Sequence, residues 1–299
     1  MGRNFIATDY HGCMNEDTRG GLGLWGPSPP RASGSLGVAE RGPAPINVLL
    51  RAGNLSALPW LRHAFGTRAC GLSHPQPHRI PNHPLLLMLR QIHSNLVWQD
   101  PQPGQAGDGM FSRRRGVLLT IRSADCCPVL LADARHRAIA AVHAGWRGTL
   151  ARIAAVAVGE MRAAFGTQPE DVLAAVGPCI RGCCYEVGPE IQQAFAARFA
   201  SSEAWFQAAE PDPVRDRYPM LFMTGAPPGH PRDPRWNPSS PARLNLQAAL
   251  RAQLEEAGLA PAAIEVLPYC TRCRPDLFYS HRRGDSGRML SAIGLAATD

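Results

Sequence analysis

Residues 116–165 read GVLLTIRSADCCPVLLADARHRAIAAVHAGWRGTLARIAAVAVGEMRAAF, and this stretch decides the fold class of the 299-residue chain. Two short apolar runs with β-branched residues, 116–121 and 138–142, have the length of buried strands. Over 150–165, apolar residues recur every three or four positions, which predicts a helix that Gly166 terminates. The order strand, loop, strand, loop, helix favours an α/β domain.

Two reactive side chains follow these strands. Cys126 lies in the first loop and His143 follows the second strand, so both are expected just past carboxyl ends, where open α/β sheets place ligand sites. Glycines flank Trp146 and Arg147 directly before the helix. Glycine allows a ligand close to the backbone, and a helix N-terminus with an arginine attracts an anion. A tight strand-to-helix turn with the tryptophan in the core is the alternative interpretation.

Charge, composition and cysteine usage favour a cytoplasmic protein. The net charge of +7 comes from arginine alone, and the basic residues form no run and no pattern with aromatic residues, so nucleic acid is not an expected partner. No apolar run approaches the roughly 20 residues that cross a membrane, and the N-terminus shows no signal peptide. Nine cysteines, an odd number, fit reduced thiols better than a disulfide framework.

The remaining chain is read as one domain, 46–299, after a Gly- and Pro-rich extension, 1–45, that we predict to be disordered. The proline-rich stretch 212–241 is expected to be a surface insertion. Further strands are expected at 46–50, 85–89, 171–176, 264–267 and 289–295, and helices at 189–199 and 244–257.

His93, Cys126 and His143 form the first candidate site. Two imidazoles and a thiolate are three zinc ligands, with a fourth position open for water or substrate, as in catalytic zinc sites. Alternatively, Cys126 and His143 act as a nucleophile–base pair that attacks an acyl group. A metal competes for the same thiolate, so the two interpretations exclude each other in the resting enzyme.

Other side chains allow two interpretations each. Asp125 serves acid–base chemistry, or it caps a turn and orients a neighbouring ligand. Arg282 and Arg283 near Asp285 form an anion site or a surface ion pair. A structural zinc site or thiols packed in a core are the alternatives for Cys270 and Cys273 with Cys179, Cys183 or Cys184. A solvated loop is favoured over a metal site for His74, His78 and His83.

Several short motifs together resemble one known family. They are Gln91-Ile92-His93, SADCCPVL at 123–130, VHAGWRG at 142–148, Gly177-Pro178, CYEVG at 184–188 and FYSHRR at 278–283. In this order they resemble the laccase-domain family, first named for polyphenol oxidase and now regarded as purine nucleoside phosphorylases. The resemblance implies a single layered sandwich domain of the α/β or α+β class, with mixed β-sheets flanked by helices.

The resemblance also implies a metal and a reaction. Zinc, or else copper, is held by His93, Cys126 and His143. The implied reaction is phosphorolysis of adenosine, inosine, guanosine or S-methyl-5′-thioadenosine, with deamination of adenosine in some members. The residues expected to act in catalysis are Cys126, His143 and Asp125, and those expected to bind substrate are Arg68, Arg147, Arg282 and Arg283.

Three rival functions remain at this stage. They are a cysteine hydrolase using Cys126 and His143, a copper-dependent polyphenol oxidase, and an inactive nucleotide-binding protein. The oxidase is the hardest to support, because three ligands make one metal site and multicopper oxidation of phenols needs several coppers with many more histidines.

Overall fold

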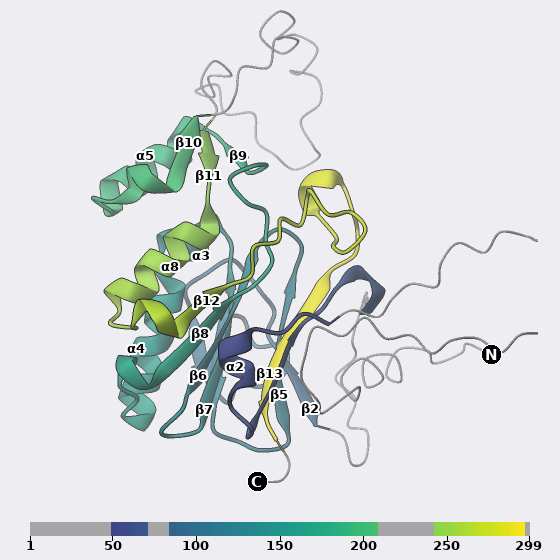
Figure 1. Cartoon of the computed structure of the whole chain (residues 1–299), viewed down its shortest axis with the longest axis vertical. Helices are drawn as coiled ribbons and strands as arrows, with labels where there is room; N and C mark the ends of the chain where they lie inside the picture. The colour runs from purple at the N-terminus through teal and green to yellow at the C-terminus, as the bar shows by residue number, and fades with distance from the viewer. Residues whose placement is uncertain (1–48, 71–83, 209–241, 297–299) are drawn as a thin grey trace, which may run out of the picture.

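The computed structural model describes residues 49–70, 84–208 and 242–296 (Figure 1). The predicted extension 1–45, the predicted insertion 212–241 and the three histidines of 74–83 lie outside the described residues. Only the last residues of the strand expected at 46–50 are described, and Leu50 there forms an isolated bridge with Phe65. Among the described residues, no helix is both long and apolar enough to cross a bilayer.

A mixed six-stranded sheet forms the centre of the domain, in the order β12-β8-β6-β7-β4-β3. Its outer pairs, β12 with β8 and β3 with β4, are parallel, and the inner pairs are antiparallel. The strands are β3 (Val97–Gln99), β4 (Gly109–Ser112), β6 (Cys127–Asp133), β7 (Ala138–Ala144), β8 (Val172–Val176) and β12 (Ile264–Val266).

A four-stranded sheet, in the order β1-β13-β5-β2, packs on one face of this central sheet. Its strands are β1 (Leu61–Phe65), β2 (Leu85–Met88), β5 (Val117–Ser123) and β13 (Met289–Leu295), with the short helix α2 (Gly53–Ser56) beside them. The other face is covered by α3 (Trp146–Leu150), α4 (Ile153–Phe165) and α8 (Leu246–Glu256) (Figure 1). The domain therefore has three layers, which confirms the predicted α+β sandwich.

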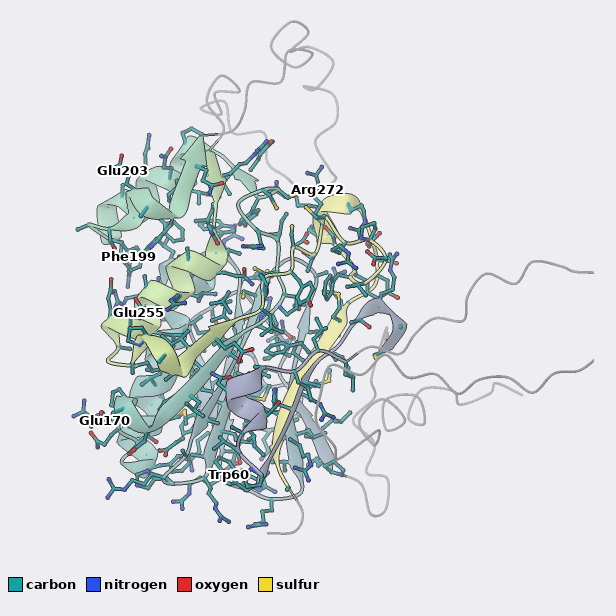
Figure 2. All side chains as sticks on the ribbon, viewed as in Figure 1. Trp60, Glu170, Phe199, Glu203, Glu255 and Arg272 are labelled. Carbon is teal, nitrogen blue, oxygen red and sulfur yellow. The ribbon has the colours of Figure 1, made fainter. Side chains whose placement is uncertain are left out.

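Strict alternation along the central strands builds the two hydrophobic cores. In β7, Ala140 and Val142 face the helices, whereas Ile139 and Ala141 face the four-stranded sheet. Both faces are buried because side chains fill both inter-layer spaces (Figure 2). A strand buried on both faces reads as a continuous apolar run instead of an alternating one. This burial pattern explains why β7 is recognisable from its composition alone.

A small third sheet completes the described fold. It has the order β10-β11-β9 and is formed by β9 (Glu186–Val187), β10 (Phe206–Ala208) and β11 (Ala242–Leu244). Helix α5 (Pro189–Arg198) lies next to this sheet (Figure 1), and it confirms the helix predicted at 189–199. The 3₁₀ turns are η1 (Arg68–Cys70), η2 (Pro169–Asp171), η3 (Ser202–Trp205), η4 (Pro261–Ala263) and η5 (His281–Arg283).

The decisive stretch 116–165 differs from its predicted structure in two places. Strand β6 occupies Cys127–Asp133, within a segment expected to be a loop. It was missed because a short apolar run beginning with cysteine and proline has no helical or alternating period. The predicted helix is interrupted at Arg152, whose φ of 61° is left-handed, so it becomes α3 and α4; Gly166 ends α4 as predicted.

Candidate functional site

The structure brings His93, Cys126 and His143 together. Their ligand atoms all lie within 4.8 Å of one another, although 50 residues of sequence separate the two histidines. His93 follows β2 with a left-handed φ of 59°, Cys126 lies in the turn between β5 and β6, and His143 is the penultimate residue of β7. His143 is buried while His93 is exposed, so the cluster has one open side.

The register of β6 and β7 places Cys126 beside the glycine loop. Cys127 pairs with Ala144, so Cys126 falls opposite Gly145 at the end of this antiparallel pair. A Cβ at position 145 would lie only 2.8 Å from Cys126 Sγ and 3.3 Å from His93 Cδ2. The glycine before Trp146 is therefore required for space at the site. The carboxyl-end rule of parallel sheets does not explain this geometry, because the two strands are antiparallel.

Asp108 is a central residue that sequence reasoning missed. Its Oδ1 lies 2.9 Å from His143 Nδ1, and its carboxylate accepts hydrogen bonds from the backbone N–H groups of Ile92, His93 and Ser94. The bond to Nδ1 leaves Nε2 of His143 as the ligand nitrogen, as is usual for metal-binding histidines. The sequence signal that could have pointed to Asp108 is its position between two glycines, directly before β4.

Electrostatics favour a thiolate at Cys126. Burial alone would raise the pKa of the Cys126 thiol, but charge and hydrogen-bond interactions with His143 and His93 lower this pKa to about 6. Burial would lower the pKa of His143, but Cys126 and Asp108 raise it to about 9. The pKa of Asp108 falls to about 2 against the effect of its burial, through His143 and Ser94. Metal binding and nucleophilic attack both need this thiolate.

The donor set fits a zinc-class metal. Imidazole nitrogen and thiolate sulfur are both ligands of zinc, and three of them leave a coordination position open. Copper accepts the same donors, so the residues alone do not distinguish the two metals. Asp108 adds the outer carboxylate that usually accompanies a histidine ligand. His93, Cys126 and His143 are the residues that would hold the ion.

Asp125 has a fixed place beneath the site. It is buried with a φ of 84°, and its carboxylate accepts from Thr271 Oγ1 at 2.6 Å, Ser280 Oγ at 3.0 Å and the backbone N–H of Arg282 at 2.7 Å. Since both oxygens are engaged, the geometry supports the positioning interpretation of Asp125. Because Asp125 directly precedes Cys126 in the chain, these bonds hold the segment carrying Arg282 next to Cys126.

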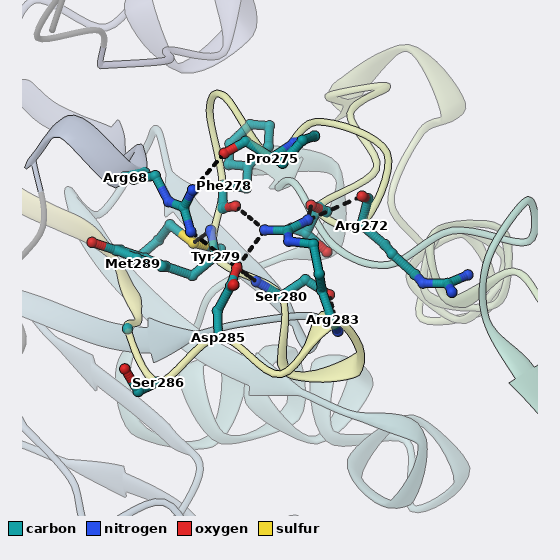
Figure 3. Close-up of polar contacts among 12 residues, drawn as sticks. Arg68, Arg272, Pro275, Phe278, Tyr279, Ser280, Arg283, Asp285, Ser286 and Met289 are labelled. Atoms are coloured by element: carbon teal, nitrogen blue, oxygen red, sulfur yellow. Dashed lines mark hydrogen bonds and ion pairs between the residues drawn. The ribbon is translucent and has the colours of Figure 1, made fainter. Parts of the chain in front are cut away.

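Two of the four arginines expected to bind substrate are held by protein groups (Figure 3). The Arg283 guanidinium donates to the carbonyls of Thr271 at 3.1 Å and Phe278 at 2.6 Å and pairs with Asp285. Arg68 also pairs with Asp285, at 3.1 Å, and donates to a backbone carbonyl at 2.8 Å. Asp285 and these arginines thus form an internal network, which supports the ion-pair interpretation for Arg283.

The other two arginines are exposed and stack on aromatic rings. The guanidinium carbon Cζ of Arg147 lies 4.5 Å from the centroid of the Trp146 ring. Both residues come directly after Gly145. Arg282 lies 5.0 Å from the centroid of Tyr185, the ring of which is buried close to Cys126. Both residues are exposed, so a ligand can approach their guanidinium groups. These two arginines are therefore the better placed for an anionic substrate.

Gln91, the first residue of the Gln-Ile-His motif, makes a structural contact with the backbone of Arg122. Its side-chain amide donates to the carbonyl of Arg122 at 2.8 Å and accepts from the N–H of the same residue at 2.9 Å. This pair of bonds fixes the segment that leads to His93 against the end of β5.

A second group of thiols, Cys183, Cys184, Cys270 and Cys273, also comes together in the structure, without Cys179.

Comparisons with known proteins give the family. Residues 76–296 match the family described as multi-copper polyphenol oxidoreductase laccase. The chain belongs to this family. The resemblance seen in the sequence motifs is thereby confirmed.

Characterised relatives in the family have nucleoside chemistry in their names. A purine nucleoside phosphorylase of Deinococcus radiodurans is 34% identical over 280 residues, which cover 84% of this chain and 94% of the relative. The purine nucleoside phosphorylase YlmD of Bacillus subtilis is 31% identical over 193 residues, covering 64% of this chain and 59% of the relative. Adenosine deaminase RL5, from an unknown prokaryotic organism, is 34% identical over 188 residues, covering 62% and 60%. The chain therefore spans only about three fifths of the last two relatives.

A solved structure supports the fold. The protein YfiH of Bacillus licheniformis superposes with a TM-score of 0.65 at 24% identity, covering 85% of this chain and 98% of that one. At this identity the likeness concerns the arrangement of helices and strands alone. The fold of this chain is thus shared with a solved structure.

Proposed function

We propose that this chain is a zinc-dependent purine nucleoside phosphorylase, which converts a purine nucleoside and phosphate into the free base and ribose 1-phosphate. The observation that carries the proposal is the open three-ligand cluster of His93, Cys126 and His143, in a family whose relatives are named purine nucleoside phosphorylase. The cysteines of the described residues are free thiols, which suit a reducing compartment, so the cytoplasm is the proposed location.

The reaction has three parts: bond formation, bond cleavage and protonation of the leaving purine. A phosphate oxygen forms a bond to C1′ of the ribose, the C1′–N9 bond breaks, and the purine leaves with the electron pair and takes up a proton. Arg147 and Arg282 are exposed beside the cluster and would hold the phosphate dianion by forked hydrogen bonds. His93, Cys126 and His143 would hold the zinc ion, which would supply Lewis-acid chemistry at this site.

The protein prepares this site before substrate arrives. Asp108 holds His143 in one tautomer and, through three backbone N–H groups, fixes the segment carrying His93. Asp125 holds the backbone of Arg282. Such preorganisation lowers the cost of orienting the reactants.

Deamination of adenosine is a second candidate, because one relative is named an adenosine deaminase. In that reaction water adds to C6 of the purine and the amino group leaves as ammonia. The same three ligands suit both reactions, so the phosphate-binding arginines are the distinguishing feature. Oxidation of phenols by several coppers is disfavoured, since the described residues contain one histidine-bearing ligand group.

Product analysis tests the proposal. Purified protein is incubated with adenosine in phosphate and in phosphate-free buffer. Adenine with ribose 1-phosphate, formed only with phosphate, supports the phosphorylase. Inosine as the sole product supports the deaminase, and no product with any of the four proposed nucleosides contradicts both.

Substitution of Cys126 by serine distinguishes a metal site from a cysteine nucleophile. A neutral hydroxyl is a poor substitute for a thiolate ligand, so zinc content and turnover should fall together, and excess zinc should restore part of the activity. Chelator-insensitive activity in the wild type, with a stoichiometric iodoacetamide adduct on Cys126, would instead establish the cysteine hydrolase chemistry.

A further inference from the structure

Four thiols gather outside the site described above. The sulfur atoms of Cys183, Cys184, Cys270 and Cys273 all lie within 4.8 Å of one another, with 3.3 Å between Cys184 and Cys273 and 3.6 Å between Cys183 and Cys273. Four thiolates placed about 2.3 Å from a tetrahedral zinc ion lie about 3.8 Å apart. The four sulfur atoms therefore have nearly the spacing of a closed tetrahedral site.

Hydrophobic packing does not account for this cluster. Cys127 and Cys179 are fully buried, and their thiols donate to the carbonyls of Gly177 and Ile180 at 3.4 and 3.3 Å. Cys183 and Cys273, in contrast, are exposed. Exposed thiols are liable to oxidation, and a group of them with mutual contacts has no packing role to explain it.

The strand pairing of the fold brings the two cysteine pairs together. Strands β8 and β12 are parallel neighbours, so the loops that follow them leave the same end of the sheet. Backbone contacts continue the pairing beyond the strands, because Thr271 N–H donates to Cys179 O at 3.0 Å and Cys179 pairs with Cys270. One loop carries Cys183 and Cys184, and the other carries Cys270 and Cys273 around Arg272, which Figure 2 labels.

Both loops form tight turns of the kind that aim two side chains at one point. Cys184 N–H donates to Arg181 O at 2.8 Å, and Arg274 N–H donates to Cys270 O at 3.2 Å. Backbone N–H groups of Arg181, Cys273 and Arg272 are also directed at Cys270 Sγ. N–H groups directed at a sulfur atom are the outer contacts that stabilise a thiolate ligand.

We propose that Cys183, Cys184, Cys270 and Cys273 bind one zinc ion in a closed, structural site. Four sulfur ligands without an open position favour a soft metal and leave no place for water or substrate. The zinc tetrathiolate carries two negative charges, and Arg181 and Arg272 lie within the same two turns. This site is separate from the three-ligand cluster and does not depend on the proposed function.

The site would hold the rim of the active site in place. Thr271, next to Cys270, donates through Oγ1 to Asp125 at 2.6 Å, and Asp125 precedes Cys126 in the chain. Thr271 O also accepts from Arg283 at 3.1 Å. A metal that joins the two loops therefore restrains the segment that positions Asp125 and Arg282.

Metal analysis of paired variants tests the proposal. The wild-type protein, purified under reducing conditions, should contain about two zinc ions per chain, and the His93→Ala/Cys126→Ser variant about one. The Cys183→Ser/Cys273→Ser variant should also contain about one, and its remaining zinc should leave on further substitution of His93 and Cys126. Cys70→Ser, outside both groups, is the matched control and should keep the wild-type content.

Cobalt substitution identifies the ligands and does not require activity. Cobalt in a tetrathiolate site gives intense visible and sulfur-to-metal charge-transfer absorption, which should persist in His93→Ala/Cys126→Ser. In Cys183→Ser/Cys273→Ser this absorption should fall to the weaker level of a site with the single thiolate of Cys126. The proposal is overturned if the wild type and Cys183→Ser/Cys273→Ser hold equal zinc, if freshly prepared protein shows a disulfide within the tetrad by mass spectrometry, or if the tetrad holds iron. Should the His93→Ala/Cys126→Ser variant fail to fold, the zinc contents of the wild type and of Cys183→Ser/Cys273→Ser still decide.

Discussion

Asp108 and His143 are joined twice, through Oδ1 to Nδ1 at 2.9 Å and through the carbonyl of Asp108, which accepts from the N–H of His143 at 2.7 Å. The register explains this double contact, because β4 pairs with β7 so that Gly109 lies opposite Val142, and Asp108 falls opposite His143 at the next step. Asp108, at the end of one strand, thus orients His143 on the neighbouring strand, a residue that could hold a metal ion.

The first prediction concerns this contact. Asp108→Asn keeps the shape of the side chain but removes the charge that fixes the His143 tautomer. We expect zinc affinity at the three-ligand site to fall about 10–100-fold, measured by competition with a chelator in the Cys183→Ser/Cys273→Ser background.

Asp133→Asn is the matched control, because Asp133 Oδ2 also lies 2.9 Å from a histidine Nδ1, that of His136, away from both thiol sites. It should leave zinc affinity unchanged. Equal affinity in the Asp108→Asn and Asp133→Asn proteins would show that Asp108 has no influence on the metal.

The second prediction concerns the absence of a side chain at Gly145. Its φ of −81° and ψ of −178° suit any residue, so a substitution there acts through the side chain alone. Gly145→Ala places a methyl group 2.8 Å from Cys126 Sγ. Overpacking of this kind costs about 1–3 kcal/mol, so metal affinity and turnover should drop roughly 10-fold or more.

Gly159→Ala provides the comparison for that experiment. Gly159 is exposed within α4, and nothing lies within 4 Å of its added Cβ. The change should stabilise the helix by about 0.5–1 kcal/mol and leave metal content unaltered. If Gly145→Ala behaves in the same way, the close approach to Cys126 is not needed for the site.

The third prediction separates substrate-binding from structural arginines. Arg147→Ala should raise the KM for phosphate roughly 10-fold, through loss of a charged hydrogen-bond donor, with little change in melting temperature. Arg283→Ala should instead lower the free energy of unfolding by about 1–3 kcal/mol, because it removes the side chain that donates to the carbonyls of Thr271 and Phe278 and one of the two ion pairs of Asp285. Steady-state kinetics at varied phosphate and thermal unfolding measure the two effects; the opposite pattern would reverse the assignment.

The fourth prediction concerns stability below neutral pH. His63 is buried and its Nε2 accepts from Ala52 N–H at 2.9 Å. Burial, assisted by Arg51, lowers the pKa of His63 from 6.5 to about 4. Between these values the unfolded chain binds a proton that the folded chain does not, so stability falls as pH drops from 6.5 toward 4, by about 3 kcal/mol in all.

Denaturant titrations of wild type and His63→Gln across this pH range measure the effect. Glutamine keeps a hydrogen-bond acceptor but does not titrate, so the variant should lose most of the slope below pH 6.5. His281→Gln, at an exposed histidine, is the control and should retain the wild-type slope. Identical slopes in wild type and His63→Gln would assign the acid sensitivity to other groups.

Much of the secondary structure was predictable from particular residues. Strands β7 and β13 are short, mainly apolar runs, and α8 shows helical spacing before Gly258, which adopts a φ of 99°. Strand β6 escaped prediction because its apolar run, starting at Cys127-Pro128, is as compatible with a buried loop as with a strand. The left-handed Arg152 that divides α3 from α4 also has no signal in the local pattern.

The sequence by itself determined the ligand types and their family: a thiol and two imidazoles at recognisable motif positions, in a chain whose apolar periods specify layered sheets and helices. Only the tertiary structure decided which polar groups meet. Strand register set Asp108 against His143, parallel strand ends brought Cys183 and Cys184 to Cys270 and Cys273, and folding paired Arg283 with Asp285. Local sequence fixes period and burial, whereas contacts between residues far apart depend on register and loop geometry, which no short pattern encodes.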